Sequence, residues 1–266
     1  MFKISSSQSL VAVASAGALA LLSACGGAET AQQGELTGQV QVFAAASLNS
    51  AGAELEKTFE EENPGVDVSF NYAGSSLLVQ QMEQGAAPDL LITADTATMD
   101  GATASVPDLA DAPVQTLATN RLVLVAATGN PADIHSVQDL GRQGVTVALC
   151  AAEVPCGNLA QQELDQQGVQ LTGATEEQNV SEVATKVATG AVDAGFIYST
   201  DSAALQKSQD VTEIALPDLE SNVYPLAVTA SGQQNEAASA FSRWLSEEEA
   251  QRILADFGFG SPSSAE

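Results

Sequence analysis

The stretch FAAASLNSAGAELEKTF, residues 43–59, passes from a strand-like run into a helix-like run through three alanines and a serine. The apolar residues before Ser47 suit a buried strand, and those after it recur at the spacing of an amphipathic helix. A strand that turns directly into a helix is typical of βαβ units. We therefore predict an α/β fold, and we take the uncharged corner at Ser47 as a first candidate ligand position.

Strand-like and helix-like segments alternate along nearly the whole chain after residue 38. The predicted strands are residues 40–47, 66–74, 89–95, 120–127, 145–150 and 192–199. The predicted helices are residues 48–62, 75–85, 136–144, 158–168, 179–190 and 201–208, followed by two amphipathic helices within 235–259. Such alternation with short connections favours mainly parallel sheets flanked by helices, and 266 residues suffice for one large unit or two lobes.

The composition limits the classes of partner. The formal net charge is −26, from 34 acidic and 8 basic residues. Nucleic acids and anionic membrane surfaces would repel such a protein, so we exclude both as direct partners. An apolar fraction of 45% is enough for a folded core, although only 5% of the residues are aromatic. The core must therefore rely on small residues.

Residues 1–24 have the pattern of an export signal. Lys3 gives a positive start, and the apolar run LVAVASAGALALL, residues 10–22, is short for a membrane span. The following LSAC resembles the end of a bacterial lipoprotein signal, which implies cleavage before Cys25 and lipidation of that cysteine. The alternative is an ordinary cleaved signal in which Cys25 has no role. Residues 25–37 are polar and predict a flexible tether.

Cys150 and Cys156 are the other two cysteines. An exported chain ordinarily oxidises two neighbouring thiols, so we predict a disulfide between them. The alternative is a metal site, but it lacks further ligands because His135 is the single histidine and lies in a predicted loop. The C-x5-C spacing also differs from the C-x-x-C of thiol redox motifs.

Four corners that open helices share an uncharged character. They lie at Ser47, at Ser75 and Ser76, at Cys156 and Gly157, and at Val180 and Ser181. The first N–H groups of a helix have no intrahelical partner and carry the positive end of the helix dipole, so each corner could bind an anion. No Lys or Arg lies in these corners, which predicts an anion site of neutral donors. The alternative is that each serine merely caps its own helix.

Six motifs, in their order and spacing, resemble those of molybdate-binding proteins, the extracytoplasmic solute receptors of molybdate ABC transporters. They are VFAAASL (42–48), YAGSSLL (72–78), PDLLITAD (88–95), VPCG (154–157), GFIYSTDSA (195–203) and YPLAV (224–228). The resemblance covers residues 38–259 and implies the two-lobed fold of type II periplasmic binding proteins, with a ligand cleft between the lobes. We assign residues 38–118 and 225–260 to lobe 1, 119–224 to lobe 2 and 261–266 to a disordered tail.

The resemblance also implies a ligand set. Carried over by position, Ser47 and Ser75 would donate hydroxyl and backbone hydrogen bonds to the oxyanion. Cys156 and Val180 would donate their backbone N–H groups, and Tyr198 its phenol. The implied ligand is molybdate, with tungstate as a second, and no cofactor is expected. Many relatives lack cysteines around this VPxG motif, so we infer that the Cys150–Cys156 bridge holds the turn that aims the Cys156 amide.

The implied partners are the oxyanion and the membrane permease of an ABC transporter. We expect a monomer, lipid-anchored on the outer face of the cell membrane. A site of donors alone suits unprotonated dianions and disfavours hydrogen phosphate, whose O–H would find no acceptor. Asp95 is the acceptor nearest to a strand end, and we interpret it as a helix cap or surface residue.

Two other functions stay open as alternatives. The first is a receptor for sulfate or another small oxyanion, because cavity size cannot be derived from these motifs. The second is an enzyme, which we disfavour because the chain has no G-x-S-x-G elbow. His135 is also far in sequence from every candidate serine, which gives a Ser-His-Asp triad little support.

Overall fold

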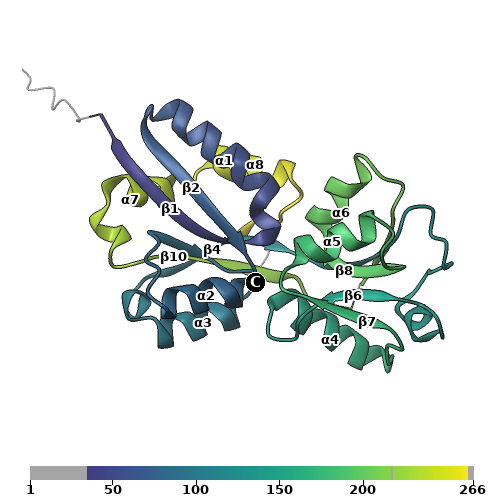
Figure 1. Cartoon of the computed structure of the whole chain (residues 1–266). Coiled ribbons are helices and arrows are strands. Elements are labelled where there is room, and N and C mark those ends of the chain that lie inside the picture. Colours follow the sequence, from purple (N-terminus) through teal and green to yellow (C-terminus); the bar gives the residue numbers. More distant parts are fainter. Residues whose placement is uncertain (1–34, 217, 263–266) are drawn as a thin grey trace, which may run out of the picture. The chain divides into compact units, whose positions relative to one another are not determined.

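The computed structural model describes residues 35–216 and 218–262. In this part of the chain, two five-stranded sheets are each packed between helices (Figure 1). The predicted export signal, Cys25 and the tether up to residue 34 lie outside the described residues, as do residues 263–266 of the predicted tail. None of the described helices has the length and apolar character that a membrane span requires.

The first sheet has the spatial order β2–β1–β3–β10–β4. Its strands are β2 (Gly65–Ala73), β1 (Thr37–Ala45), β3 (Leu90–Ile92), β10 (Asn222–Val228) and β4 (Val114–Asn120). The β2, β1 and β3 strands are parallel, whereas β10 runs antiparallel to both of its neighbours. β1 therefore begins at Thr37, one residue inside the predicted tether.

The second sheet has the order β7–β6–β8–β5–β9. Its strands are β7 (Ala174–Glu177), β6 (Val147–Cys150), β8 (Ala194–Tyr198), β5 (Leu122–Ala126) and β9 (Thr212–Ala215). The β7, β6 and β8 strands are parallel, whereas β5 is antiparallel to β8 and β9. Both sheets are thus mixed, but in each only one strand, β10 or β5, runs against the other four, so the prediction of mainly parallel sheets is confirmed.

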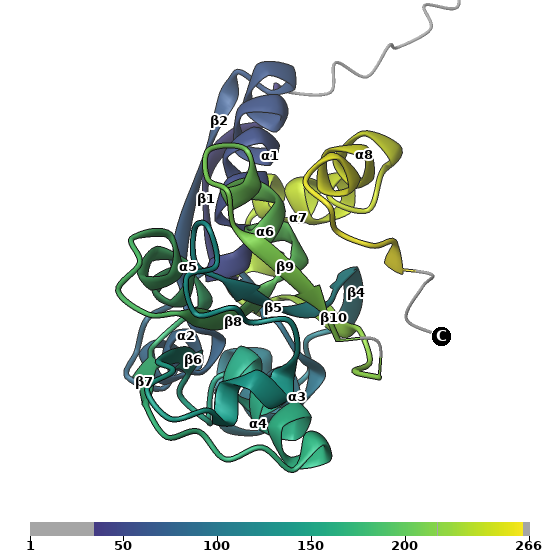
Figure 2. The same cartoon turned by 90° about the vertical axis from the view of Figure 1, so that its right-hand side faces the viewer.

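Helices cover both faces of each sheet. The α-helices are α1 (Asn49–Glu62), α2 (Ser75–Glu83), α3 (Thr96–Ser105), α4 (Pro155–Gln167), α5 (Val180–Ala188), α6 (Ser199–Gln206), α7 (Glu236–Trp244) and α8 (Glu248–Asp256). Short 3-10 helices are η1 (Ala46–Leu48), η2 (Pro107–Leu109), η3 (Val137–Gly141) and η4 (Gly232–Gln234). On the first sheet, α1, α7 and α8 lie on one face and α2 and α3 on the other (Figure 1). On the second, α5 and α6 lie opposite α4 (Figure 2).

The chain crosses between the two sheets twice. β4 ends at Asn120 and β5 begins at Leu122, so a single residue, Arg121, separates the sheets there. The return crossing runs from β9 to β10, which begins at Asn222 and pairs with Asn120. The first sheet therefore extends two to three residues beyond the predicted lobe boundaries at 118/119 and 224/225.

The strand β1 shows why both faces of the first sheet are buried. Val42 packs into the core under α1, α7 and α8, whereas the next residue, Phe43, packs into the core under α2 and α3. Successive side chains of a strand point to opposite faces, so an unbroken apolar run fits a strand covered on both sides. This arrangement leaves only the strand ends available for a site.

An aromatic cluster anchors α1 to the two C-terminal helices. The Phe59 ring lies 4.9 Å from the Phe241 ring and 5.3 Å from the Trp244 ring, centroid to centroid, and Phe59 is 2% exposed. Burial of these large rings contributes both transfer free energy and edge-to-face contacts.

Replacement of Phe59 by alanine is expected to lower the free energy of unfolding by about 3 to 5 kcal/mol, because it removes a buried ring and leaves a cavity. Chemical denaturation followed by circular dichroism measures this loss. Val114→Ala is the control, since Val114 is 47% exposed and its truncation should change stability by at most about 0.5 kcal/mol. Equal effects of the two substitutions would contradict the assigned core.

Candidate functional site

The first residues of helices that follow strands of both sheets surround one small cavity of about 10 Å³. Its lining comprises Ala45, Ala46, Ser47, Ala73, Gly74, Ser75, Ala94, Val154, Pro155, Cys156, Asn179, Val180 and Tyr198. All five residues predicted to bind an oxyanion are in this lining. The structure therefore brings together residues that are up to 151 positions apart in the sequence, between Ser47 and Tyr198.

The lining of this cavity carries no charged side chain among the described residues. Alanines and a glycine supply much of the wall, so backbone groups are accessible close to the cavity. Cavities that bind drug-sized molecules range from about 300 to 1,000 Å³, so a ligand of that size does not fit this much smaller one. The predicted absence of Lys and Arg from the corners agrees with this lining.

Ser47 is not a helix cap. It lies in η1, whose N-cap is Ala45, and α1 has Leu48 as its N-cap; neither cap makes a side-chain hydrogen bond. The Ser47 side chain is 6% exposed, and its Oγ lies 2.7 Å from the hydroxyl of Tyr224. The capping alternative for this serine is therefore wrong.

Ser75 is the first residue of α2, after Gly74 as N-cap, and is 1% exposed. Its Oγ accepts a hydrogen bond from the Ala94 backbone N–H at 3.0 Å. An oxygen engaged as an acceptor in this way leaves its own O–H proton for another acceptor. Ser76 behaves differently, because it is absent from the lining and donates to the carbonyl of Glu153.

Two helix starts of the second sheet complete the wall. Cys156 is the second residue of α4 and Val180 the first of α5, so neither backbone N–H has an intrahelical partner. The N-cap of α5 is Asn179, whose side chain accepts from the Glu182 N–H. Ser181, another residue of the predicted corner, is not in the lining.

Cys150 and Cys156 form a disulfide that joins the end of β6 to the start of α4. The turn it spans is tight, because a Cβ at Gly157 would lie 2.0 Å from the Ala151 carbonyl oxygen. The sulfurs therefore restrain the segment whose second helical residue presents its amide to the cavity. Gly157 itself serves packing and does not line the cavity.

Tyr198 ends β8 and is 1% exposed. Its hydroxyl has no hydrogen-bond partner among the described residues, although it borders the cavity. Burial, followed by the neighbouring Tyr224, Asp95 and Asp201, raises the pKa of Tyr198 well above its usual value. The phenol is thus a protonated donor at neutral pH. A buried donor without a partner is costly.

Two carboxyl groups lie near the tyrosine but outside the lining. Asp95 is the N-cap of α3 and accepts from the Thr98 N–H at 2.7 Å, which confirms its interpretation as a cap. Asp201 accepts from the Tyr198 backbone N–H at 3.3 Å, and desolvation raises the pKa of its carboxyl to about 7. Part of its charge is therefore absent at neutral pH, which lessens its repulsion of an anion.

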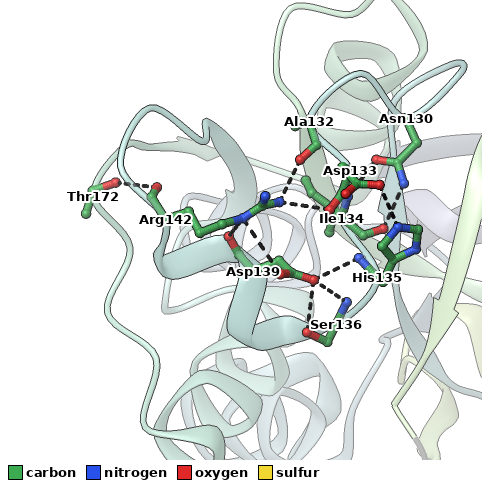
Figure 3. A network of polar contacts seen from close by, with 9 residues as sticks. All are labelled: Asn130, Ala132, Asp133, Ile134, His135, Ser136, Asp139, Arg142 and Thr172. Carbon is green, nitrogen blue, oxygen red and sulfur yellow. Dashed lines mark hydrogen bonds and ion pairs between the residues drawn. The ribbon is translucent and has the colours of Figure 1, made fainter.

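His135 belongs to a separate polar network (Figure 3). Its ring Nε2 lies 2.7 Å from the Asp133 carboxylate, and its backbone N–H donates to Asp139. That N–H is the main cause that lowers the pKa of Asp139. The His135 side chain is 68% exposed and is not in the cavity lining, so it does not form a triad with Ser47 or Ser75. The described residues also contain no cluster of three or more His, Cys, Asp or Glu suited to a metal ion.

The two sides of the cavity are in direct contact. A Cβ at Gly74, on the side of the first sheet, would lie 2.2 Å from the backbone oxygen of Gln178 on the side of the second. The hydrogen bond from Ser76 to Glu153 joins the same two sides. Only a residue without a side chain fits at position 74 in this arrangement.

Comparison with known proteins places this architecture in a family. Residues 40–260 match the family model of the bacterial extracellular solute-binding proteins. The chain belongs to this family. This solute-binding protein is 41% identical over 225 residues to the molybdate-binding protein ModA of Mycobacterium tuberculosis, which covers 84% of this chain and 85% of that protein. The predicted family and the two-lobed α/β fold are thus confirmed.

Solved structures agree on the fold of this solute-binding protein. The periplasmic molybdate-binding protein of Azotobacter vinelandii has a TM-score of 0.73 and 20% identity, with 84% of this chain and 99% of that chain covered. The sulfate-binding protein SubI from Mycobacterium tuberculosis also has a TM-score of 0.73 and 20% identity, with 85% and 88% covered. The likeness at this identity concerns the fold alone and does not separate the two ligands.

Removal of the disulfide is expected to lower the free energy of unfolding by about 2 kcal/mol, the chain-entropy value for a loop of this short length. The measurement is denaturation of the Cys150→Ala, Cys156→Ala double variant against the oxidised protein. The oxidised protein treated with a reductant is the control and should approach the variant. A reductant that leaves the denaturation midpoint unchanged would contradict a stabilising bridge.

Proposed function

We propose that this protein binds molybdate, and tungstate as a second ligand, outside the cell and delivers it to the membrane permease of an ABC transporter. The observation that carries the proposal is the cavity lined by helix starts, with the unpartnered Tyr198 hydroxyl at its border and no charged side chain in its wall. Helix starts and neutral hydroxyls stabilise an oxyanion through dipoles and hydrogen bonds. The identity to the ModA relative supports molybdate as the ligand.

Each of the five predicted ligand residues has a defined part in this proposal. Ser47 and Ser75 donate hydroxyl and backbone hydrogen bonds from the side of the first sheet. Cys156 and Val180 donate backbone N–H groups from the side of the second sheet, and Tyr198 donates its phenol. The oxyanion therefore bonds to both sides at once, which favours the arrangement in which they touch.

A cavity that offers only hydrogen-bond donors also selects between oxyanions. Molybdate, tungstate and sulfate are unprotonated dianions at neutral pH and accept from every donor. Hydrogen phosphate carries an O–H that needs an acceptor, and a buried donor without one is costly. Sulfate is the second candidate ligand, because the fold of SubI is equally similar.

The proposed location in the cell follows from the family and from the predicted export signal. A lipid on Cys25 would hold a monomer at the outer face of the cell membrane, with the tether giving it reach to the permease. The permease would recognise the ligand-bound form. Neither catalysis nor a cofactor has a part in this proposal.

Isothermal titration of the purified protein with molybdate, tungstate, sulfate and phosphate tests the proposed function. The expected result is tight binding of molybdate and tungstate, weaker binding of sulfate and little binding of phosphate. Absence of binding to molybdate and tungstate would overturn the proposal, and a clear preference for sulfate would favour the second candidate.

Ser47→Ala and Ser75→Ala are each expected to weaken molybdate binding by about 1 to 3 kcal/mol, because each removes a hydrogen bond to a charged acceptor. Tyr198→Phe should have a similar or smaller effect. Titration calorimetry at neutral pH measures these losses. Ser181→Ala is the matched control, since Ser181 opens α5 beside Val180 but does not line the cavity. If both cavity serines can be replaced without loss, their assignment as ligands is wrong.

Gly74→Ala is expected to weaken molybdate binding on the order of tenfold, because the new Cβ would meet the Gln178 oxygen and oppose contact between the two sides. The thermal midpoint of the ligand-free protein should change little. Gly101→Ala is the control, since a Cβ there meets nothing within 4 Å. Unchanged affinity in the Gly74 variant would show that this contact is not needed for binding.

A further inference from the structure

Tyr224 contacts Ser47, a residue of the cavity lining. It belongs to β10, is fully buried, and does not line the cavity. Its Oη is 2.7 Å from the Ser47 Oγ, and either oxygen could supply the proton of that hydrogen bond. The direction of this one bond decides whether Ser47 has its own proton left for a ligand. Burial is the main cause that raises the pKa of Tyr224, so its hydroxyl stays protonated.

The direction is set by Asn120, the last residue of β4. Its Oδ1 accepts from the backbone N–H of Arg121 at 2.9 Å and from the hydroxyl of Ser199 at 3.0 Å. A backbone N–H can only donate, so this end of the amide is the oxygen and the other end is the NH₂ group. That NH₂ donates to Thr200 Oγ1 at 3.0 Å and, more weakly, to Tyr224 Oη at 3.4 Å.

Tyr224 Oη therefore accepts a hydrogen bond from Asn120, and its own buried O–H needs an acceptor, because a buried donor left unpaired is costly. Among the hydrogen bonds of the described residues, Ser47 Oγ is the acceptor that the Tyr224 hydroxyl reaches. We propose that Asn120 and Tyr224 are positioning residues that fix Ser47 as a hydrogen-bond donor to the bound oxyanion. Hydrogen bonds then run in one direction, from Arg121 N–H and Asn120 through Tyr224 to Ser47 and into the cavity. This inference rests on the proposed function.

The consequence is specificity for unprotonated oxyanions. A free serine hydroxyl can rotate and either donate or accept, so it could serve the O–H of a hydrogen phosphate. A hydroxyl that accepts from Tyr224 and donates to the oxyanion cannot rotate to aim its remaining lone pair, so it serves that O–H poorly. Ser75 is held in the same sense by the Ala94 N–H. Both cavity hydroxyls would thus discriminate by proton count.

A double-mutant cycle tests whether Tyr224 acts through Ser47. Molybdate binding is measured by calorimetry for the unmodified protein, Tyr224→Phe, Ser47→Ala and the double variant. We expect Tyr224→Phe to weaken binding about five- to tenfold in the unmodified protein and less than about twofold in the Ser47→Ala background. Losses that multiply independently in the double variant would overturn the inference.

A second measurement separates positioning from loss of structure. Phosphate is titrated in competition with molybdate at a pH where hydrogen phosphate prevails. In Tyr224→Phe the preference for molybdate over phosphate should narrow about tenfold, because Ser47 regains its acceptor role. An equal loss of affinity for molybdate and phosphate would indicate that Tyr224 is merely structural and would overturn the inference.

Tyr72→Phe is the matched control, because the Tyr72 hydroxyl lacks a hydrogen-bond partner among the described residues and is absent from the cavity lining. It should leave affinity and preference unchanged. Thermal unfolding of each variant without ligand checks that the fold is kept. If the unmodified protein binds neither molybdate nor tungstate, the proposed function and this inference both fail. If it binds them and the cycle is additive, the inference alone fails.

Discussion

The site depends on one property of helices, namely that their first N–H groups have no partner within the helix. The sheets bring several such starts to one cavity, at η1, α2, α4 and α5. These donors can stabilise a dianion only if little else competes for it, and the lining supplies no charge of either sign. The net charge of −26 repels a bound dianion only modestly, because surface charges are screened over about 8 Å at physiological salt.

Two sheets are needed to surround the ligand with donors, because one sheet offers these N–H and hydroxyl groups from a single side. The ends of β1 and β2 present Ser47 and Ser75, and the ends of β6, β7 and β8 lead to the opposite wall. Small residues such as Gly74 allow the two sides to touch. Because the chain passes between the sheets at Arg121 and again before Asn222, the two sides belong to one connected unit and can share a ligand.

The sequence predicts the corners well because their signals are local. A strand followed by small residues and an amphipathic run identifies Ser47 and Ser75, and family motifs add Tyr198. Short or weakly patterned elements escaped this reasoning: β7 and β9 have four residues each, and α3 is rich in Ala and Thr with little amphipathic pattern. The one strand in each sheet that opposes the others, β10 or β5, could not be identified, because alternation of segments says nothing about strand direction. Tyr224 is 177 residues from Ser47 in the sequence, and the hydrogen bond between them forms only when the chain packs.

Hydrogen-bond direction is the last requirement for discrimination between oxyanions. A hydroxyl is ambivalent, so a cavity lined by hydroxyls has no fixed preference until their second partners are fixed. Here the direction begins at the Arg121 backbone N–H, a donor that cannot reverse, and reaches Ser47 through Asn120 and Tyr224. Asn120 also accepts from Ser199 at the start of α6. The segment that links the two sheets would therefore also set the polarity of the cavity, which ties specificity to the crossing itself.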